Sequence, residues 1–190
     1  MGAQQHWRKP KQAAVTPPPP PQLLQYLRLR AGPHQFGISI DVVRELLEYL
    51  PLTSLPHMPP PLCGMLNLRG SGVPVIELAQ CLGLPAAPVQ RRSCIIILQL
   101  TASQTPQEIG MLVDEVYAVQ ELARSEIEAA PQLGALLPEH FIAGLLREPH
   151  GFTVLLDASR LLVLDELAGL AKPPAEPAPP DLLLQEEAHD

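Results

Sequence analysis

Short stretches in which apolar and polar residues alternate are the feature that most constrains how this chain can fold. Residues 27–30 read Leu-Arg-Leu-Arg, and residues 36–40 read Phe-Gly-Ile-Ser-Ile. Because successive side chains of a β-strand point to opposite faces, this alternation predicts two strands, each with one buried face. The intervening Ala-Gly-Pro-His at residues 31–34 is typical of a turn, so the two strands are predicted to form a hairpin.

Further strand-length apolar runs follow at close spacing. A second hairpin is predicted from residues 62–68 and 73–78, with a glycine-containing turn that begins at Arg69. A loop is expected at residues 84–92 and a polar turn at residues 101–107. The other runs of strand length lie at residues 94–100, 109–113, 116–122, 141–146 and 152–156.

Three short helices are expected among these strands. Apolar residues fall at i, i+3, i+4 and i+7 within residues 41–50, so this stretch is predicted to be an amphipathic helix that Asp41 caps and Pro51 ends. One helical turn is expected at residues 79–83. Asp157 is a candidate cap for a last helix that begins one residue later.

About nine short strands with few helices predict an all-β architecture of barrels or a sandwich. The longest interval between the early strands, residues 79–93, is the expected boundary between two lobes. Two small barrels packed on each other would leave few exposed sheet edges. No convincing internal repeat is visible at the level of individual residues.

The two ends of the chain differ in composition from the middle. Of the 24 prolines, 11 lie in residues 1–21 and 172–190. Proline has no amide donor and a fixed φ, so both segments are expected to be extended and disordered, either as tethers to a further partner or as solvated ends. The remaining residues, 22–171, are the expected folded domain.

The charge of this expected domain disfavours several classes of partner. Residues 22–171 contain nine arginines, no lysine and fifteen acidic residues, a net charge of −6. Such a balance argues against nucleic acid and anionic membranes, and six aromatic residues are too few for base-stacking platforms. No apolar run reaches eighteen residues, so no direct membrane insertion is expected.

Candidate catalytic groups are few. Cys63 could act as a nucleophile with His57 or His140, but it begins an apolar strand and has no neighbouring cation to lower its pKa, so a packed core cysteine is favoured. Asp114 and Glu115 are adjacent, so in a strand they would point to opposite faces and could not act as a carboxylate pair. The six histidines lack the spacing of metal ligands, and no glycine-rich loop opens a helix. No metal or cofactor is therefore expected.

Arg69 stands out because it follows an apolar strand, precedes Gly70 and is one of few cations in an acidic domain. Two interpretations remain open. It is either a solvated turn arginine, or a rigidly held donor that captures a carboxylate or backbone carbonyls of a partner.

The run at residues 64–78, Gly-Met-Leu-Asn-Leu-Arg-Gly-Ser-Gly-Val-Pro-Val-Ile-Glu-Leu, closely resembles the CheW family of chemotaxis coupling proteins. The resemblance covers roughly residues 23–164 in unbroken order. It departs from the family pattern at Glu77, where aspartate is common, and in the proline-rich residues 59–61. The other matching segments are residues 36–40, 43–45, 56–59, 109–116, 141–144, 155–157 and 161–162, together with the single residues Val119, Ile127 and Pro131.

This resemblance implies two intertwined SH3-like five-stranded β-barrels around a shared core, and no enzymatic activity. It also implies a cytoplasmic adaptor at receptor arrays of the inner membrane. The adaptor would connect the cytoplasmic tips of methyl-accepting chemotaxis receptors to the CheW-like regulatory domain of a CheA-type histidine kinase. The residues implied in receptor binding are Val43, Glu45, Gly64, Asn67 and Arg69. The residues implied in kinase binding, as exposed apolar ends of the predicted hairpin, are Leu66, Leu68, Val73, Val75 and Ile76.

Three functions are therefore compared. The first is the chemotaxis adaptor, because such a protein needs an apolar patch and a few directional polar groups but no perturbed acid or base. The second is the same adaptor role in a pathway for pilus motility or surface sensing. The third is a small thiol hydrolase, which would require an exposed Cys63 with a lowered pKa.

Overall fold

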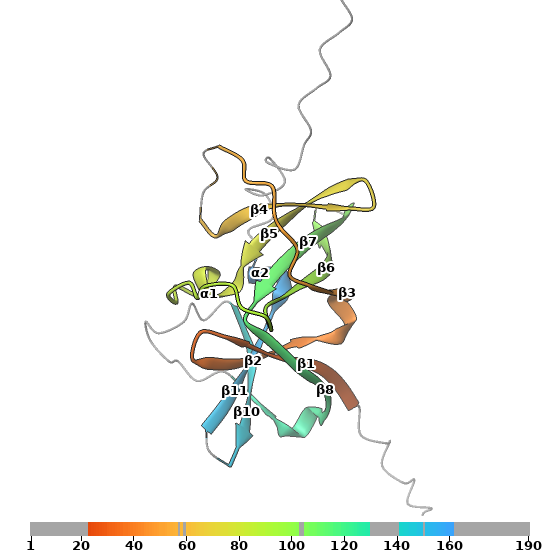
Figure 1. Ribbon diagram of the computed structural model, residues 1–190. Coiled ribbons are helices and arrows are strands. Elements are labelled where there is room, and N and C mark those ends of the chain that lie inside the picture. Colours follow the sequence, from red (N-terminus) through yellow and green to blue (C-terminus); the bar gives the residue numbers. More distant parts are fainter. Residues whose placement is uncertain are drawn as a thin grey trace, which may run out of the picture.

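Two β-sheets form two lobes that lie one above the other in Figure 1. Within the described part of the chain there are eleven strands, two short α-helices and two 3-10 turns, which confirms the predicted all-β fold of two SH3-like barrels. The expected tails, residues 1–21 and 172–190, lie outside that part. The computed structural model describes residues 23–56, 58, 60–102, 105–129, 141–149 and 151–161.

The first lobe is a five-stranded sheet from the middle of the chain. Its strand order is β3-β6-β7-β5-β4, and its neighbours are antiparallel except for the parallel pair β5 and β7. The helix α1 (Leu78–Cys81) follows β5. The strands of this lobe are β3 (Val43–Glu48), β4 (Leu62–Leu68), β5 (Ser71–Glu77), β6 (Cys94–Ala102) and β7 (Thr105–Val113).

The second lobe combines the first two strands of the chain with the last four. Its order is β8-β1-β2-β11-β10-β9, with β2 and β11 parallel. The two-residue strand β9 makes this sheet six-stranded, where five strands were expected, and α2 (Ala158–Leu161) follows β11. The strands are β1 (Leu23–Ala31), β2 (His34–Ser39), β8 (Glu115–Ala123), β9 (Ile127–Glu128), β10 (Ile142–Glu148) and β11 (Gly151–Leu156).

The chain starts in the second lobe, crosses to the first and returns. The 3-10 turn η1 (Ile40–Val42) leads from β2 to β3, and Asp114 alone separates β7 from β8. A shared core packs side chains of both sheets, including the fully buried Leu29 and Phe36 of the second lobe and Ile96 of the first. The lobes are therefore intertwined around a shared core, as predicted.

The prediction of a helix at residues 41–50 is wrong. Only residues 40–42 form a 3-10 turn, and the strand β3 that follows shows alternating burial and pairs antiparallel with β6. Val43 and Leu47 pack against cores, whereas Leu46 stays 47% exposed. The apolar spacing follows the helix period and does not alternate, so pairing with β6 overrides the local pattern.

The expected division of the lobes near residues 79–93 does not match the sheets. The strand before this segment, β5, and the strand after it, β6, belong to the same sheet. The chain changes lobe at η1 and at Asp114, where the strands follow each other almost without a break. The turn predicted at residues 101–107 is also shorter, because Ala102 pairs with Thr105.

The two lobes contain a structural repeat that the sequence alone did not reveal. The hairpins β4–β5 and β10–β11 share one register and one bulge, with Gly64 and Gly144, 80 residues later, at the same position. In the parallel strand beside each hairpin, Gly110 and Gly37 are equivalent. This second spacing is 73 residues, so no single offset aligns the two halves of the sequence.

Candidate functional site

The turn of the β4–β5 hairpin holds Arg69 in a defined, exposed position. Arg69 and Gly70 both have left-handed backbone angles, with φ of 53° and 88°, as two-residue hairpin turns require. The Asn67 side chain supports the turn, because its Oδ1 accepts a 3.0 Å hydrogen bond from the Gly70 N–H. Left-handed backbone is strained for arginine, and such strain is often concentrated at functional positions.

The guanidinium of Arg69 lies against a carboxylate of another strand. Its Nη2 donates to Glu45 Oε1 at 3.0 Å and to Glu45 Oε2 at 2.9 Å. The Arg69 side chain is nevertheless 72% exposed, and that of Glu45 is 30% exposed. We call Glu45, Asn67, Arg69 and Gly70 the Arg69 surface; it holds a cation in a defined position while leaving that cation exposed to water.

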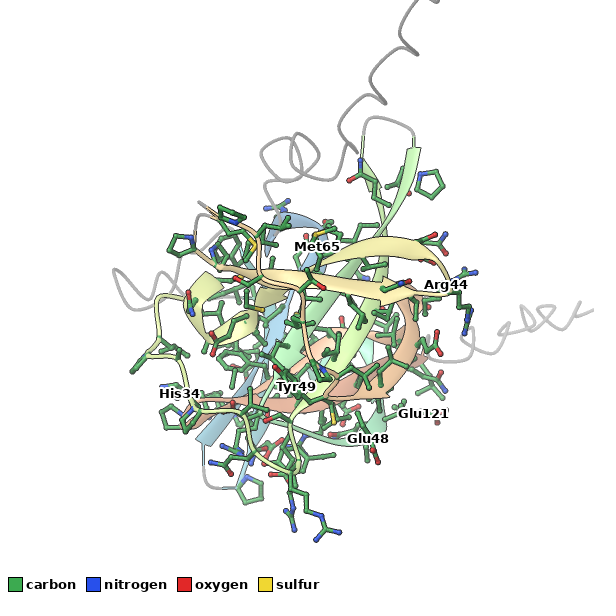
Figure 2. All side chains as sticks on the ribbon, turned by 45° about the horizontal axis from the view of Figure 1, so that its top comes forward. His34, Arg44, Glu48, Tyr49, Met65 and Glu121 are labelled. Atoms are coloured by element: carbon green, nitrogen blue, oxygen red, sulfur yellow. The ribbon has the colours of Figure 1, made fainter. Side chains whose placement is uncertain are left out.

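The Arg69 surface also closes the first barrel. Glu45 is on β3 and Arg69 follows β4, and these strands are the two ends of the first-lobe sheet. Thr53 and Met65 join the same two sides through a pair of 2.9 Å backbone hydrogen bonds. Met65, on β4, is labelled in Figure 2. Backbone pairing and an ion pair together connect the open edges of the sheet.

Arg44 is a neighbouring polar group that the sequence analysis missed. Its Nε lies 2.9 Å from Glu108 Oε1, and its Nη1 donates to Gln99 Oε1 at 3.2 Å. Arg44 points outward in Figure 2, and Leu46 lies on the same exposed face of β3. Reading residues 41–50 as a strand would have revealed this shared face, since alternate residues of a strand lie together.

Gly64 and Val43 differ from the other implied receptor-binding residues. Gly64 is buried, and a β-carbon there would lie 2.7 Å from Leu52 Cβ and 3.1 Å from the Thr53 carbonyl oxygen. Val43 is partly buried and packs against the shared core. The structure therefore brings Glu45, Asn67 and Arg69 together, while Gly64 lies beneath the surface.

The expected exposure of the implied kinase-binding residues is wrong for four of the five. Leu66, Val73, Val75 and Ile76 are 3%, 2%, 0% and 0% exposed, and Leu68 is partly buried. β5 lies between β4 and β7 in the sheet, with Val73 and Val75 in the first-lobe core and Ile76 in the shared core. A strand that is buried on both faces presents few side chains to a partner.

The thiols are held in their neutral form. Burial, with a smaller effect of Glu77, raises the pKa of Cys63 to about 11, and its thiol donates a 3.1 Å hydrogen bond to the Val75 carbonyl oxygen. Burial raises the pKa of Cys81 to about 12. The candidate partners of Cys63, His57 and His140, lie outside the described residues. A thiol with a raised pKa is a poor nucleophile at neutral pH.

Asp114 and Glu115 do not point apart as predicted. Asp114 lies between the strands β7 and β8, and both carboxylates reach Arg30, at 3.4 Å to Nη1 and 3.5 Å to Nε respectively. Asp114 Oδ2 also accepts a 2.7 Å hydrogen bond from the Gly32 N–H. These contacts tie the β1–β2 turn to the crossover between lobes, which is a structural role.

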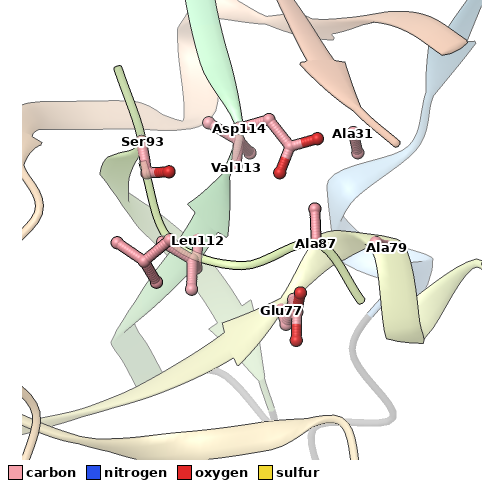
Figure 3. Close-up of a pocket in the computed structure, with 9 residues that line it drawn as sticks. Ala31, Glu77, Ala79, Ala87, Ser93, Leu112, Val113 and Asp114 are labelled. Carbon is pink, nitrogen blue, oxygen red and sulfur yellow. The ribbon is translucent and has the colours of Figure 1, made fainter. Parts of the chain in front are cut away.

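The pocket in Figure 3 has residues from both lobes in its lining, among them Ala31, Glu77 and Asp114. Its accessible volume is about 10 Å³, roughly what one water molecule requires. Among the residues that the structure describes, no three metal-ligating side chains are grouped together. Across the same part of the chain, no helix is long and apolar enough to span a membrane.

Comparison with known proteins identifies the family. The family model of the CheW-like domain matches residues 25–166 of this chain. A probable chemotaxis protein CheW of Rhizobium etli is 32% identical over 122 residues, which cover 64% of this chain and 76% of that protein. Chemotaxis protein CheW of Bacillus subtilis is 30% identical over 128 residues, covering 67% and 80%. Protein PilI of Pseudomonas aeruginosa is 26% identical over 126 residues, covering 66% and 68%.

A solved structure shows the same fold. The crystal structure of scaffolding protein TtCheW from Thermoanaerobacter tengcongensis superposes with a TM-score of 0.66 at 23% sequence identity, covering 79% of this chain and 93% of that one. The described strands, the matched domain and these relatives agree with the resemblance found in the sequence. The chain therefore belongs to the CheW-like domain family.

Proposed function

We propose that the protein is a non-catalytic adaptor that couples methyl-accepting chemotaxis receptors to a CheA-type histidine kinase. Family membership supports this role, and so does the fold shared with TtCheW, which is a scaffolding protein. The single observation that carries the proposal is the Arg69 surface, where a strained turn holds an exposed guanidinium against Glu45. A binding protein needs such a directional group, whereas an enzyme would need converging reactive ones.

The receptor contact would be made by Arg69, Glu45 and Asn67, with Val43 beside them. The guanidinium can donate to an acidic side chain or a backbone carbonyl of the receptor tip while Glu45 holds its orientation. Because Arg69 is 72% exposed, a partner can reach its guanidinium directly, and a carboxylate or carbonyl of that partner must offset the hydration that the guanidinium loses on binding. We expect a modest pairwise affinity that an array strengthens through multivalency.

The kinase contact would involve the β4–β5 hairpin, with Leu68 as its partly buried apolar member. Leu66, Val73, Val75 and Ile76 would support that surface from beneath, since they are buried. Substitutions at these four positions would then act on the kinase contact through the shape of the hairpin. The protein would work in the cytoplasm at receptor arrays of the inner membrane, without a cofactor.

The test is the Arg69→Ala variant, with its affinity for a receptor cytoplasmic fragment measured by calorimetry. Losing one central arginine contact costs about 1 to 3 kcal/mol, or about 5- to 150-fold in Kd. Binding to the regulatory domain of the kinase should not change. Arg147→Ala is a matched control, because Arg147 is 68% exposed and pairs with Glu128 at 2.9 Å on the other lobe. Unchanged receptor binding by Arg69→Ala, or equal losses in both variants, would contradict the proposed receptor contact.

A second pathway has support from one relative. Protein PilI of Pseudomonas aeruginosa matches this chain over 126 residues, so the adaptor could serve a pathway for pilus motility or surface sensing. The same surfaces would act in both pathways. Identifying the kinase and receptors that co-purify with the full chain from its own cells would distinguish them. The hydrolase alternative is disfavoured by the raised pKa of Cys63.

A further inference from the structure

The structural repeat places a charged residue inside the second lobe where the first lobe is apolar. Arg28 pairs with Gly37 across β1 and β2, and Ile97 pairs with Gly110 across β6 and β7. Since Gly37 and Gly110 are equivalent, Arg28 is the counterpart of Ile97. Ile97 is 0% exposed and belongs to the first-lobe core. Arg28 thus occupies a barrel position that an apolar side chain fills in the other lobe.

Arg28 contacts side chains of four other strands. Its Nη2 lies 2.6 Å from Glu148 Oε1 on β10 and donates to Thr153 Oγ1 on β11 at 3.3 Å. Its guanidinium also donates to Gln35 Oε1 on β2 at 2.5 Å and to Gln120 Oε1 on β8 at 3.3 Å. The Thr153 hydroxyl donates to the same Glu148 oxygen at 2.9 Å. We call these five side chains the polar hub; they come from five of the six strands of the second lobe.

The first-lobe counterparts of Arg28, Glu148 and Thr153 are all apolar, whereas Gln35 corresponds to Glu108. Leu68 and Val73 are the counterparts of Glu148 and Thr153, at the same register positions 80 residues earlier. Leu68 and Val73 pack with Ile97 in one cluster. The two lobes therefore fill equivalent barrel ends in different ways, the first by apolar packing and the second by hydrogen bonds and charge.

The polar hub is an unfavourable way to fill a barrel if stability is the only requirement. The side chains of Arg28 and Glu148 are 25% and 28% exposed, so both charges lose much of their hydration. Arg28 Nε is buried and has no hydrogen-bond partner among the described residues, which adds a desolvation cost. Apolar replacements of such groups are often neutral or stabilising, whereas removing one partner alone is destabilising. The polar hub instead specifies one arrangement of its strands, because hydrogen bonds are directional and select one geometry.

We propose that Arg28 is a positioning residue that orders the β10–β11 hairpin against β1, β2 and β8. This hairpin lies at the opposite end of the molecule from the β4–β5 turn in Figure 1. Its end carries an exposed cation–aromatic pair, with the Arg147 guanidinium 5.2 Å from the ring centre of Phe152, which is 52% exposed. A residue of β1 thus determines the geometry of a surface that β10 and β11 form. The inference does not depend on the proposed partners.

The test is hydrogen exchange of backbone amides in the full-length protein, comparing the two equivalent hairpins. Arg28→Ile introduces the first-lobe residue but leaves the Glu148 carboxylate without its cation, and we expect about tenfold or more faster exchange in β10–β11. Exchange in β4–β5 should stay unchanged. The triple variant R28I/E148L/T153V copies the apolar level of the first lobe, and we expect it to restore slow exchange in β10–β11. Its urea midpoint should exceed that of R28I.

Two results would overturn the proposal. One is an Arg28→Ile protein in which β10–β11 exchange is unchanged, or in which both hairpins accelerate equally. The other is a triple variant that protects β10–β11 no better than Arg28→Ile does. If Arg28→Ile does not fold, the triple variant provides the test. Native-like protection of the β10–β11 amides in the triple variant supports the role of the polar hub, and an unfolded triple variant contradicts it.

Discussion

Gly64→Ala tests whether Gly64 contacts a partner or shapes the protein beneath the surface. The new β-carbon would lie 2.7 Å from Leu52 Cβ and 3.1 Å from the Thr53 carbonyl oxygen, and neither atom can move by a simple side-chain rotation. Overpacking of this kind costs about 1 to 3 kcal/mol. The backbone at φ 158° favours glycine, which adds about 1 to 3 kcal/mol for any other residue. We expect a total loss of about 2 to 6 kcal/mol in the free energy of unfolding.

Urea denaturation followed by circular dichroism measures this loss. With a slope of about 2 kcal/mol per molar, the midpoint should fall by about 1 to 3 M. Gly72→Ala is the matched control on the same hairpin, because its β-carbon would meet only the flexible Met65 Cε at 3.3 Å; it should change stability by less than about 0.5 kcal/mol. A Gly64→Ala protein with an unchanged midpoint but lost receptor binding would refute the packing argument and make Gly64 a direct contact.

Four further predictions concern the hairpin and its surroundings. Val75→Ala should lower the free energy of unfolding by about 1 to 3 kcal/mol, because it leaves a cavity in the core. Calorimetry on the folded variant should show a kinase affinity changed by less than tenfold. A larger loss of kinase affinity would indicate that Val75 contacts the kinase directly. A variant that retains Cys63 as its one thiol should react slowly with a disulfide reagent at pH 7 to 8, because the raised pKa of Cys63 keeps its thiol neutral. The reaction should accelerate toward pH 11. Fast reaction at pH 7 would contradict this prediction. The same raised pKa should make stability fall as pH rises from about 9 to about 11, since only the unfolded thiol ionises freely there. A double-mutant cycle on Glu45 and Arg69 in the free protein should give a coupling below about 1 kcal/mol, as for other exposed pairs, and a larger value would make the pair mainly structural.

Much of the candidate site followed from local sequence. The glycine after Arg69 predicts a tight turn, and the structure confirms that Arg69 stands on it with Asn67 in support. Glu45 was implied by the family resemblance, and the ion pair with Arg69 joins residues 24 positions apart. No local pattern could indicate that contact, because it depends on the closure of the barrel between β3 and β4.

Errors in the prediction share one physical cause. The helix predicted at residues 41–50, the expected exposure of Val75 and the expected separation of Asp114 from Glu115 all depended on which neighbours surround a segment. The helical apolar spacing of residues 41–50 is overridden by pairing with β6, and an apolar run does not show whether one face of its strand or both will be buried. Only the pairing partners settle these questions.

The sequence by itself determined the β-strand content, the positions of most strands and turns, the acidic charge and the family, because alternation, turn residues and motif order are local properties. The tertiary structure decided how the strands divide between two lobes, because β1 and β2 pair with strands about a hundred residues away. It also decided which apolar residues are buried and which charges meet. Those outcomes come from packing between distant segments, and the repeat that relates Arg28 to Ile97 becomes visible only once their strands are paired.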